Sequence, residues 1–345
     1  MITIKQIAEI AGVSPSTVSH VLNGRMHKMS QETREKVERT LRDHKYISNM
    51  GGHLLGNGSS RIIGVILTYA RRSEMNVARD SFFSEIIGAL ENEIRSNGYY
   101  MMLYTSGDVD EGLRIAASWK VEGLVVLGAL AHDCSRYMEG TNTPLVFIDS
   151  YFYDDGKAYV NIGLHDKKGA YMMTKYLITQ GHKRIAFLAD GNPPMGVDCE
   201  RRDGFFAALT DHGLPADEGQ YLYISHRCAE REAFLSTFLE EKFRGFTALF
   251  FASDFYAVDS MNYFQDHGLR VPEHVSVCGF DDSILSVQCR PKLTTVHQTV
   301  SQKASYAVAQ LLRILRKENI DPKIIRLKVS LQIRDSVRQM ESLNC

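Results

Sequence analysis

The sequence predicts a small all-α head followed by a larger α/β core. Three observations support this fold class. Residues 1–46 have helical periodicity throughout, residues 47–61 are rich in glycine and serine, and apolar strand segments alternate with amphipathic helices from Ile62 onward. The 345 residues are enough for two or three structural units.

The head begins with two short helices joined by a tight turn. Thr3 is a good N-cap for the first helix, and Gly12 ends it. Ser14 and Pro15 are the residue types preferred at the N-cap and the first position of a second helix. A third helix is predicted after Ser30. Two short helices with this connection are typical of a helix-turn-helix.

The second helix has a polar face suited to DNA. Helical periodicity exposes Pro15, Ser16, Ser19, His20 and Asn23 together. A major groove admits such a helix, and small hydrogen-bonding side chains near its start reach base edges. The Ser14 hydroxyl, the helix N-termini and Arg34 can hold phosphates. A helical protein-docking domain with a polar face is the alternative interpretation.

Charge is distributed unevenly along the chain. Residues 1–60 hold eight Lys and Arg against five Asp and Glu, whereas the remainder holds 32 against 36. A basic head on an acidic body is the pattern of a polyanion-binding module joined to a second function. An ordinary solvated surface explains an excess of three charges equally well.

The core reads as alternating strands and helices. Strands are predicted at 62–67, 99–104, 124–127, 145–148, 185–188, 248–251 and 275–279. Helices are predicted at 82–97, 109–119, 166–180, 202–212, 229–242, 254–267 and 299–317. Such alternation predicts parallel sheets with crossover helices.

Several protein classes are excluded by what the sequence contains. Its longest apolar stretches are far too short to span a membrane, and its first residues are no secretory signal. Six scattered cysteines without metal-site spacing predict reduced thiols in a cytoplasmic protein. No phosphate-loop, dinucleotide-binding or nucleophile-elbow motif occurs. We therefore expect no enzyme, no cofactor and no metal.

Long segments of the chain resemble the LacI/GalR family of bacterial transcription regulators. In the head these are Thr3-Ile4-Lys5-Gln6-Ile7-Ala8, Ala11-Gly12-Val13-Ser14-Pro15-Ser16-Thr17-Val18-Ser19-His20-Val21-Leu22-Asn23-Gly24, residues 30–37 and residues 46–49. In the body they are residues 181–187, 251–254, 268–282 and 291–296. The resemblance covers nearly the whole chain.

The resemblance implies a set of DNA contacts in the head. Phosphates would be faced by Thr17, Ser19, Asn23, Ser30 and Thr33, and bases would be read from Pro15, Ser16 and His20. An Arg is frequent at position 20 in the family, so His20 leaves the operator sequence open. The family's joint folds on operator DNA into a short helix, and Leu55 fits its minor-groove wedge. Gly51 and Gly52 raise the cost of forming that helix by about 1–2 kcal/mol.

For the body, the resemblance implies a core like that of periplasmic sugar-binding proteins. Two parallel-sheet lobes, joined by three crossovers, would enclose a ligand cleft. The expected domains are a head at 1–46, a hinge at 47–61, an effector-binding and dimerisation core at 62–337 and a tail at 338–345. The first lobe would comprise about 62–161 and 290–320, and the second about 162–289 and 321–337.

Five residues of the core are candidates for effector contact. Arg201 offers a fork of donors, Asp254 follows a strand and accepts hydrogen bonds from a diol, and Asp149 ends a strand where α/β sheets keep their ligands. Phe82 and Phe83 stand where family members stack an aromatic ring on the effector. Each has a structural alternative: an N-cap for Asp254, an ion pair within a lobe for Arg201, and core packing for the two phenylalanines. The pair Asp281-Asp282 is expected to form a turn.

The resulting hypothesis is a homodimeric, cytoplasmic transcription regulator, a repressor, that binds double-stranded operator DNA. A small ligand in the cleft, a sugar or sugar derivative, would control the affinity for DNA. The alternatives are a sugar-binding or sugar-processing protein with a docking head, a purine-responsive regulator, and a regulator that activates transcription.

Overall fold

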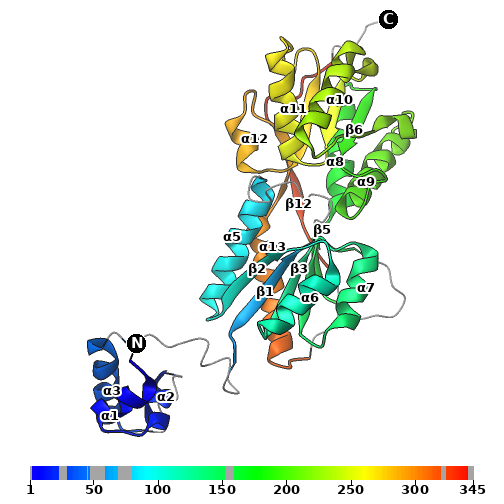
Figure 1. Cartoon of the computed structure of the whole chain (residues 1–345). Coiled ribbons are helices and arrows are strands. Elements are labelled where there is room, and N and C mark those ends of the chain that lie inside the picture. The colour runs from blue at the N-terminus through cyan, green and yellow to red at the C-terminus, as the bar shows by residue number, and fades with distance from the viewer. Residues whose placement is uncertain are drawn as a thin grey trace, which may run out of the picture. The chain divides into compact units, whose positions relative to one another are not determined.

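The structure of the chain is a computed structural model that describes residues 2–22, 29–44, 46, 59–68, 80–151, 159–319 and 324–340. It divides into two units, Met1–Ser60 and Arg61–Cys345 (Figure 1). None of the helices among these residues is long and apolar enough to cross a bilayer.

The smaller unit contains the three predicted helices, α1 (Ile4–Ala11), α2 (Pro15–Leu22) and α3 (Gln31–Asp43). Thr3 and Gln6 form a capping box at the start of α1, and Gly12 ends the helix in a left-handed conformation. Its apolar side chains meet in one small core of Ile7, Ala8, Ala11, Val18, Val21 and Val37. The core leaves the start of α2 exposed.

The first lobe of the larger unit is built on a sheet of six parallel strands in the order β11-β5-β4-β3-β1-β2. Its strands are β1 (Ile62–Leu67), β2 (Tyr100–Thr105), β3 (Gly123–Leu127), β4 (Leu145–Ile148), β5 (Asn161–Leu164) and β11 (Ile324–Leu327). Its helices are α5 (Ser81–Ser96), α6 (Val109–Ser118), α7 (Ala131–Gly140) and α13 (Val300–Leu315).

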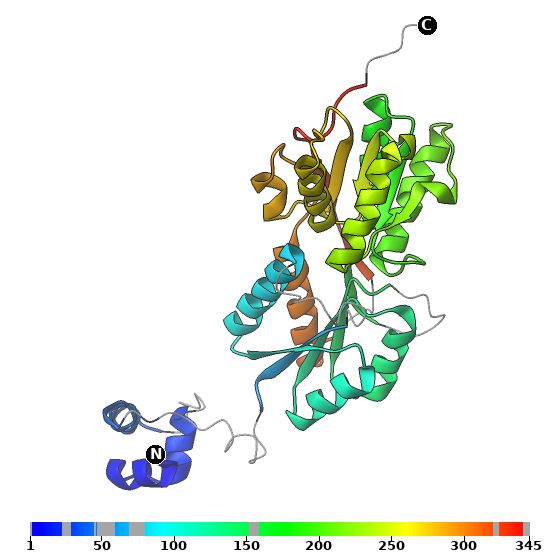
Figure 2. The same cartoon turned by 45° about the horizontal axis from the view of Figure 1, so that its top comes forward.

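Alternation along β1 explains how this sheet is covered. Ile63 and Val65 face a core shared with α5 and α13, whereas Ile62 and Ile66 face a core shared with α6 and α7. Figures 1 and 2 show α5 and α13 side by side on one face of the sheet. Because both faces are covered, the strand is apolar throughout, as expected for a parallel sheet.

The second lobe has a sheet of the same size in the order β12-β10-β9-β8-β6-β7. Its strands are β6 (Ile185–Ala189), β7 (Tyr221–Tyr223), β8 (Ala248–Phe251), β9 (Ser276–Asp281), β10 (Thr294–Gln298) and β12 (Val329–Gln332), of which β12 is antiparallel to β10. Its helices are α8 (Asp166–Thr179), α9 (Val197–Asp211), α10 (Cys228–Glu240), α11 (Asp254–Asp266) and α12 (Ile284–Gln288).

The chain passes between the lobes three times, but at later residues than we expected. The crossings follow β5, β10 and β11. The segment 290–298, assigned to the first lobe from the sequence, instead places β10 beside β9 in the second sheet. Residues 324–327, assigned to the second lobe from the sequence, form β11 beside β5 in the first. Residues 338–340, expected in a tail, are hydrogen-bonded to Ser276 and Gln180 of the second lobe.

Two other differences affect the site. Helix α9 begins at Val197 rather than at residue 202, so Arg201 lies inside the helix. Helix α7 and strands β5 and β7 were not predicted, and the two strands, of four and three residues, are too short to show a periodic pattern. The five described cysteines are free.

Candidate functional site

The candidate DNA face lies at the turn between α1 and α2. Ser14, Pro15 and Ser16 are exposed, whereas Thr17, Ser19 and His20 are half-buried. The Oγ atom of Ser14 lies 2.7 Å from Oγ of Ser16 and 2.9 Å from Oγ1 of Thr17. Three hydroxyls thus share hydrogen bonds at the start of α2, where they can exchange partners with a phosphate.

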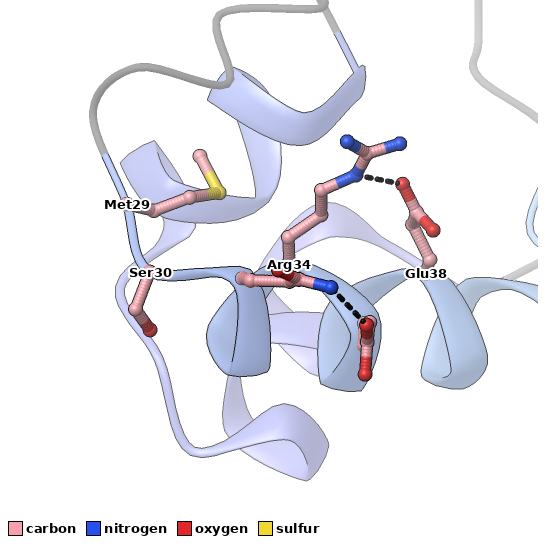
Figure 3. A pocket seen from close by; sticks show the side chains of 6 residues that line it. Met29, Ser30, Arg34 and Glu38 are labelled. Carbon is pink, nitrogen blue, oxygen red and sulfur yellow. Dashed lines mark hydrogen bonds and ion pairs between the residues drawn. The ribbon is translucent and has the colours of Figure 1, made fainter.

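The start of α3 continues the polar face of the head. Ser30 caps the helix, with its Oγ 2.8 Å from Oγ1 of Thr33. Nε of Arg34 donates to Glu38 at 2.7 Å, and both residues line an open hollow of about 390 Å³ (Figure 3). Arg34 is exposed, so its guanidinium can leave this pair for a phosphate. Two further predicted contacts, Asn23 and Leu55, lie outside the described residues.

The candidate effector site is a cavity of about 380 Å³ between the two lobes. It meets the carboxyl ends of strands from both sheets, where open α/β sheets bind their ligands. Its lining includes Asp80, Phe82, Phe83, Asp133, Arg136 and Asp149 from the first lobe, Asp190, Met195, Asp198, Arg201, His226, Tyr256 and Asp281 from the second, and Gln298 beside a crossing.

Arg201 lies in the cavity wall and is already paired. Its Nε donates to Asp166 at 2.8 Å, and its Nη1 donates to the carbonyl of Ala252 at 2.6 Å. Nη1 also lies 4.0 Å from Asp281, and the guanidinium covers the ring of Phe280 at 3.7 Å. Arg201 therefore does both things that the sequence left open: it forms an ion pair within the second lobe, and it lines the cavity. The pairs fix the guanidinium plane that a ligand would meet.

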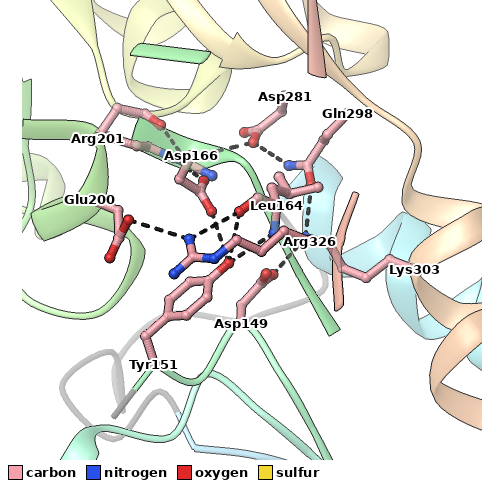
Figure 4. A network of polar contacts seen from close by, with 11 residues as sticks. Asp149, Tyr151, Leu164, Asp166, Glu200, Arg201, Asp281, Gln298, Lys303 and Arg326 are labelled. Atoms are coloured by element: carbon pink, nitrogen blue, oxygen red, sulfur yellow. Dashed lines mark hydrogen bonds and ion pairs between the residues drawn. The ribbon is translucent and has the colours of Figure 1, made fainter. Parts of the chain in front are cut away.

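A second chain of polar contacts joins the carboxylates of the two lobes (Figure 4). Nζ of Lys303 donates to Oδ2 of Asp149 at 2.7 Å and to Oε1 of Gln298 at 2.9 Å. Nε2 of Gln298 in turn donates to Oδ1 of Asp281 at 2.6 Å. Burial raises the pKa of Asp149, against the opposing effect of Lys303, and it also raises that of Asp281.

A third group of contacts crosses between the lobes beside Arg201. The hydroxyl of Tyr151, just after β4, donates to Oδ2 of Asp166 at 3.2 Å. Nη1 of Arg326, on β11, lies 3.3 Å from Glu200 of α9, and its guanidinium covers the ring of Tyr151 at 4.6 Å. Because Glu200 precedes Arg201 in α9, this group ties the cavity wall to the first lobe.

Asp254 is placed differently from what we expected. It is fully buried behind the cavity, where Oδ1 accepts from the Thr295 hydroxyl and Oδ2 accepts from the backbone N–H of Ser283. Burial raises its pKa to about 7. The cavity is lined instead by its neighbour Ser253 and by Tyr256, one helical turn further along. Asp254 thus has the structural role of joining α11 to β10 and to the segment after β9.

The two phenylalanines lie in the cavity wall. Phe83 is buried and Phe82 is half-buried, and their rings meet edge to face at 5.4 Å. Asp80 caps the helix that carries them by accepting from the backbone N–H groups of both residues. Core packing and cavity lining are therefore combined in Phe83.

Sequence reasoning missed three members of the site. Asp281 was read as part of a turn, yet it ends β9 and faces the cavity. The strand-end rule that selected Asp149 would have selected it too. Gln298 ends β10 in the same way, but that strand was not predicted. Lys303 gave no signal, because a lysine within an amphipathic helix is normally read as exposed.

Comparison with known proteins decides the family. A model of the bacterial regulatory proteins of the lacI family matches residues 3–49, and one of a periplasmic binding protein-like domain matches residues 174–337. The HTH-type transcriptional repressor PurR of Aliivibrio fischeri is 30% identical over 343 residues, which cover 98% of this chain and 98% of that protein. The chain belongs to the lacI family of bacterial regulatory proteins.

Further relatives agree with this assignment. PurR of Vibrio atlanticus is 29% identical over 346 residues, covering 99% of this chain and all of that protein. The solved structure of the Lac repressor dimer, bound to operator and the anti-inducer ONPF, superposes with a TM-score of 0.83. It is 25% identical, with 98% of this chain and 99% of that chain covered. The expected family and fold class are confirmed, and this lacI-family chain is a DNA-binding regulator with a ligand-binding core.

Proposed function

We propose that this lacI-family protein is a homodimeric repressor whose affinity for operator DNA is set by a small ligand in the inter-lobe cavity. It acts by binding alone and not as an enzyme. The observation that carries the proposal is the cavity itself, because both lobes contribute to its polar wall. Asp149 of the first lobe accepts from Lys303, and Asp281 of the second accepts from Gln298.

The proposed division of the chain keeps four parts. A head at about 1–46 binds DNA, a hinge at about 47–61 follows it, a core at about 62–337 binds the effector and forms the dimer, and a tail ends the chain. Each head would occupy one half-site of a near-palindromic operator, since the two-fold axis of a dimer matches that of the DNA.

Within each head, Ser16 and His20 are the proposed base contacts, and Pro15 packs against the groove. The phosphates would be held by Ser14, Thr17, Ser19, Asn23, Ser30, Thr33 and Arg34, and Leu55 would wedge into the minor groove. Support comes from the exposure of Ser14 and Ser16, and from the hydroxyl groups gathered at the start of α2. A helix N-terminus with such hydroxyls is a good site for phosphate.

Control by ligand requires that the ligand prefer one arrangement of the lobes. Phe82, Phe83 and Asp149 come from the first lobe, whereas Arg201 comes from the second. A ligand that contacts both groups gains more when the lobes are closed around it. The contacts of Tyr151 with Asp166 and of Arg326 with Glu200 cross the same junction, so closure must be accommodated there.

The DNA half of the proposal is tested by selection from a random duplex library with the full chain. We expect enrichment of a near-palindrome with two half-sites, and binding that weakens steeply with salt. His20→Ala should change the preferred half-site, whereas Arg34→Ala should weaken binding to all sequences alike. The proposal fails if a folded protein enriches no sequence.

The ligand half is tested by thermal shift of the full chain with sugars, sugar phosphates and purines, because a ligand that binds the folded state raises the melting temperature. Arg201→Lys should abolish the shift of the best ligand, since Lys cannot reproduce the planar fork. A sugar-binding protein with a docking head is favoured instead if deletion of the head leaves every function intact.

A further inference from the structure

We infer that Arg231, a buried residue that does not itself line the cavity, is a positioning residue for the wall that the second lobe presents to the ligand. It holds His226 and Tyr256 in place and thereby sets the affinity for the ligand. The inference rests on the proposed function, because it takes the inter-lobe cavity to be the effector site. It goes further by naming a residue that determines binding without touching the ligand.

Arg231 is a charged side chain in the interior of the second lobe. It lies on α10 with 3% of its surface exposed, beside α11 (Figure 1). Its Nε donates to Oδ2 of Asp259 on α11 at 2.6 Å. The side chain of Asp259 is 41% exposed, so water weakens the attraction within this ion pair. A buried ion pair is also weak evidence of a stabilising role, because apolar residues often replace such pairs without loss of stability.

The other donors of Arg231 hold the loop between β7 and α10. Nη1 donates to the backbone carbonyl of Ser225 at 2.9 Å and to that of His226 at 3.1 Å. Because the loop is irregular and Ser225 is buried, these carbonyls need partners from outside the loop. His226 is half-buried and lines the cavity. One nitrogen of Arg231 thus fixes the backbone that carries a cavity side chain.

The guanidinium also positions Tyr256. Its central carbon lies 5.7 Å from the centre of the Tyr256 ring and 5.8 Å from that of Phe255, within the range of a cation–π contact. The hydroxyl of Tyr256 donates to Oδ2 of Asp190 at 2.7 Å. Tyr256 and Asp190 both line the cavity. The ring of Tyr256 is therefore held by Arg231 on one side and by Asp190 at its hydroxyl.

Three separate segments of the second lobe thus depend on one side chain. Asp190 follows β6, His226 follows β7, and Tyr256 belongs to α11. Arg231 contacts the last two directly and reaches the first through Tyr256. Because a guanidinium is planar and its donors point in fixed directions, it sets the angles between these segments as well as their distances. A binding wall held in this way is ready for its ligand, whereas a loosened wall binds less well.

A purely structural role is the competing explanation. Arg231 would then join α10 to α11, and the cavity wall would not depend on it. A substitution would lower the stability of the second lobe but leave the affinity for a ligand unchanged. The two explanations therefore differ in the ligand affinity of variants that still fold.

The first test measures binding of glucose, galactose, ribose and hypoxanthine to the full chain by calorimetry. Arg231→Lys is the main variant, because lysine keeps the charge opposite Asp259 but lacks the planar fork that also reaches two carbonyls. We expect it to fold and to bind the tightest of these probes about fivefold more weakly. Asp259→Asn keeps an acceptor for Nε and leaves the two carbonyl bonds intact, so it should bind that probe like the natural protein.

Double-mutant cycles show whether Arg231 acts through the wall. His226→Ala removes the cavity side chain of the held loop, and Tyr256→Leu removes the ring beside the guanidinium. Arg231→Lys should cost less affinity when either variant is already present. Phe264→Leu is the control for stability, because Phe264 is buried near the far end of α11 and does not line the cavity. It should lower the melting temperature without changing the affinity.

A second test needs no ligand. Diethylpyrocarbonate modifies accessible imidazoles, and mass spectrometry of peptides gives the rate for each histidine. We expect Arg231→Lys to raise the rate for His226 several-fold, because the loop loses hydrogen bonds that hold it. The rate for His132, whose side chain is 71% exposed on α7 of the first lobe, should stay the same.

These outcomes decide the inference. Equal affinities of the natural protein and Arg231→Lys overturn it, and so do additive effects in both cycles. If none of the four probes binds, an unchanged rate for His226 overturns it and a raised rate upholds it. A probe whose binding depends on Arg231 as expected, but which leaves the affinity for DNA unchanged, upholds the inference and contradicts the proposed function instead.

Discussion

Nζ of Lys303 lies 2.7 Å from Oδ2 of Asp149, and both side chains are almost completely buried. The two residues are 154 positions apart, on α13 and at the end of β4. Through Gln298 the same ammonium group reaches Asp281 of the second lobe. One lysine thus holds the cavity carboxylates of both lobes in place.

Lys303→Met should destabilise the core by about 3–5 kcal/mol, because it leaves Asp149 buried without its cation. Urea unfolding of the full chain measures the loss. Adding Asp149→Asn should recover most of it, since asparagine carries no charge and tolerates the left-handed backbone at this position. A single variant as stable as the natural protein would show that the pair contributes little.

Gly204→Ala should destabilise the second lobe by about 1–3 kcal/mol through overpacking. Gly204 lies where α9 packs on α8, and a Cβ there would overlap the backbone carbonyl of Lys167. The matched control is Gly88 of α5, where a Cβ meets open space. Gly88→Ala should raise stability by about 0.5–1 kcal/mol, and thermal unfolding should separate the two variants.

Local signals in the sequence predicted the head almost completely. Thr3, Gly12, Pro15 and Ser30 act on their immediate neighbours, so caps and helix boundaries can be read without knowledge of the rest of the fold. The sequence also predicted parallel sheets, because a strand such as β1 is apolar along its whole length and this local pattern is typical of a strand covered on both faces.

The crossings and part of the site depend on long-range pairing. Strands β5, β11 and β12 have four residues each, too few to show which sheet they join. Asp281 is the last residue of β9 and Asp254 follows β8 by three residues, and only the folded structure shows that Asp254 is fully buried whereas Asp281 lines the cavity. The burial of Lys303 follows from its pairing with Asp149, which no local pattern indicates.

His182 should make the protein less stable in acid. Burial lowers its pKa to about 4, whereas an unfolded histidine titrates near 6.5. Between pH 4 and 6.5 the unfolded state binds a proton at His182 and the folded state does not. The free energy of unfolding is therefore unaffected by this group above about pH 6.5 and decreases as the pH falls toward 4. Over this range the free energy of unfolding decreases by about 3 kcal/mol.

Urea midpoints between pH 4 and 8 measure this contribution in the full chain. His182→Asn should flatten the profile, although it lowers stability at neutral pH by disturbing the contacts with Thr247 and Arg338. His132→Asn is the control, because that side chain is 71% exposed. A profile of the His182 variant as steep as that of the natural protein would contradict the assignment.

Arg34→Ala should weaken operator binding and reduce the slope of log affinity against log salt by about one. The guanidinium is exposed and, among the described residues, is paired with Glu38 on the same helix, so it is available for a phosphate. Glu38→Ala removes that neighbour and should leave the slope unchanged or steeper. Fluorescence anisotropy with one duplex at several salt concentrations gives both slopes. An unaltered slope for Arg34→Ala would remove this residue from the proposed contacts.

The central claim is that occupation of the inter-lobe cavity changes the affinity of the head for DNA. The most direct measurement is the dissociation constant of the full chain for its selected duplex, with and without a saturating amount of the ligand that gives the largest thermal shift. We expect a change of about fivefold to 150-fold, the usual range of coupling between two sites, and no change in Arg201→Lys. Equal dissociation constants with the ligand demonstrably bound would contradict the account.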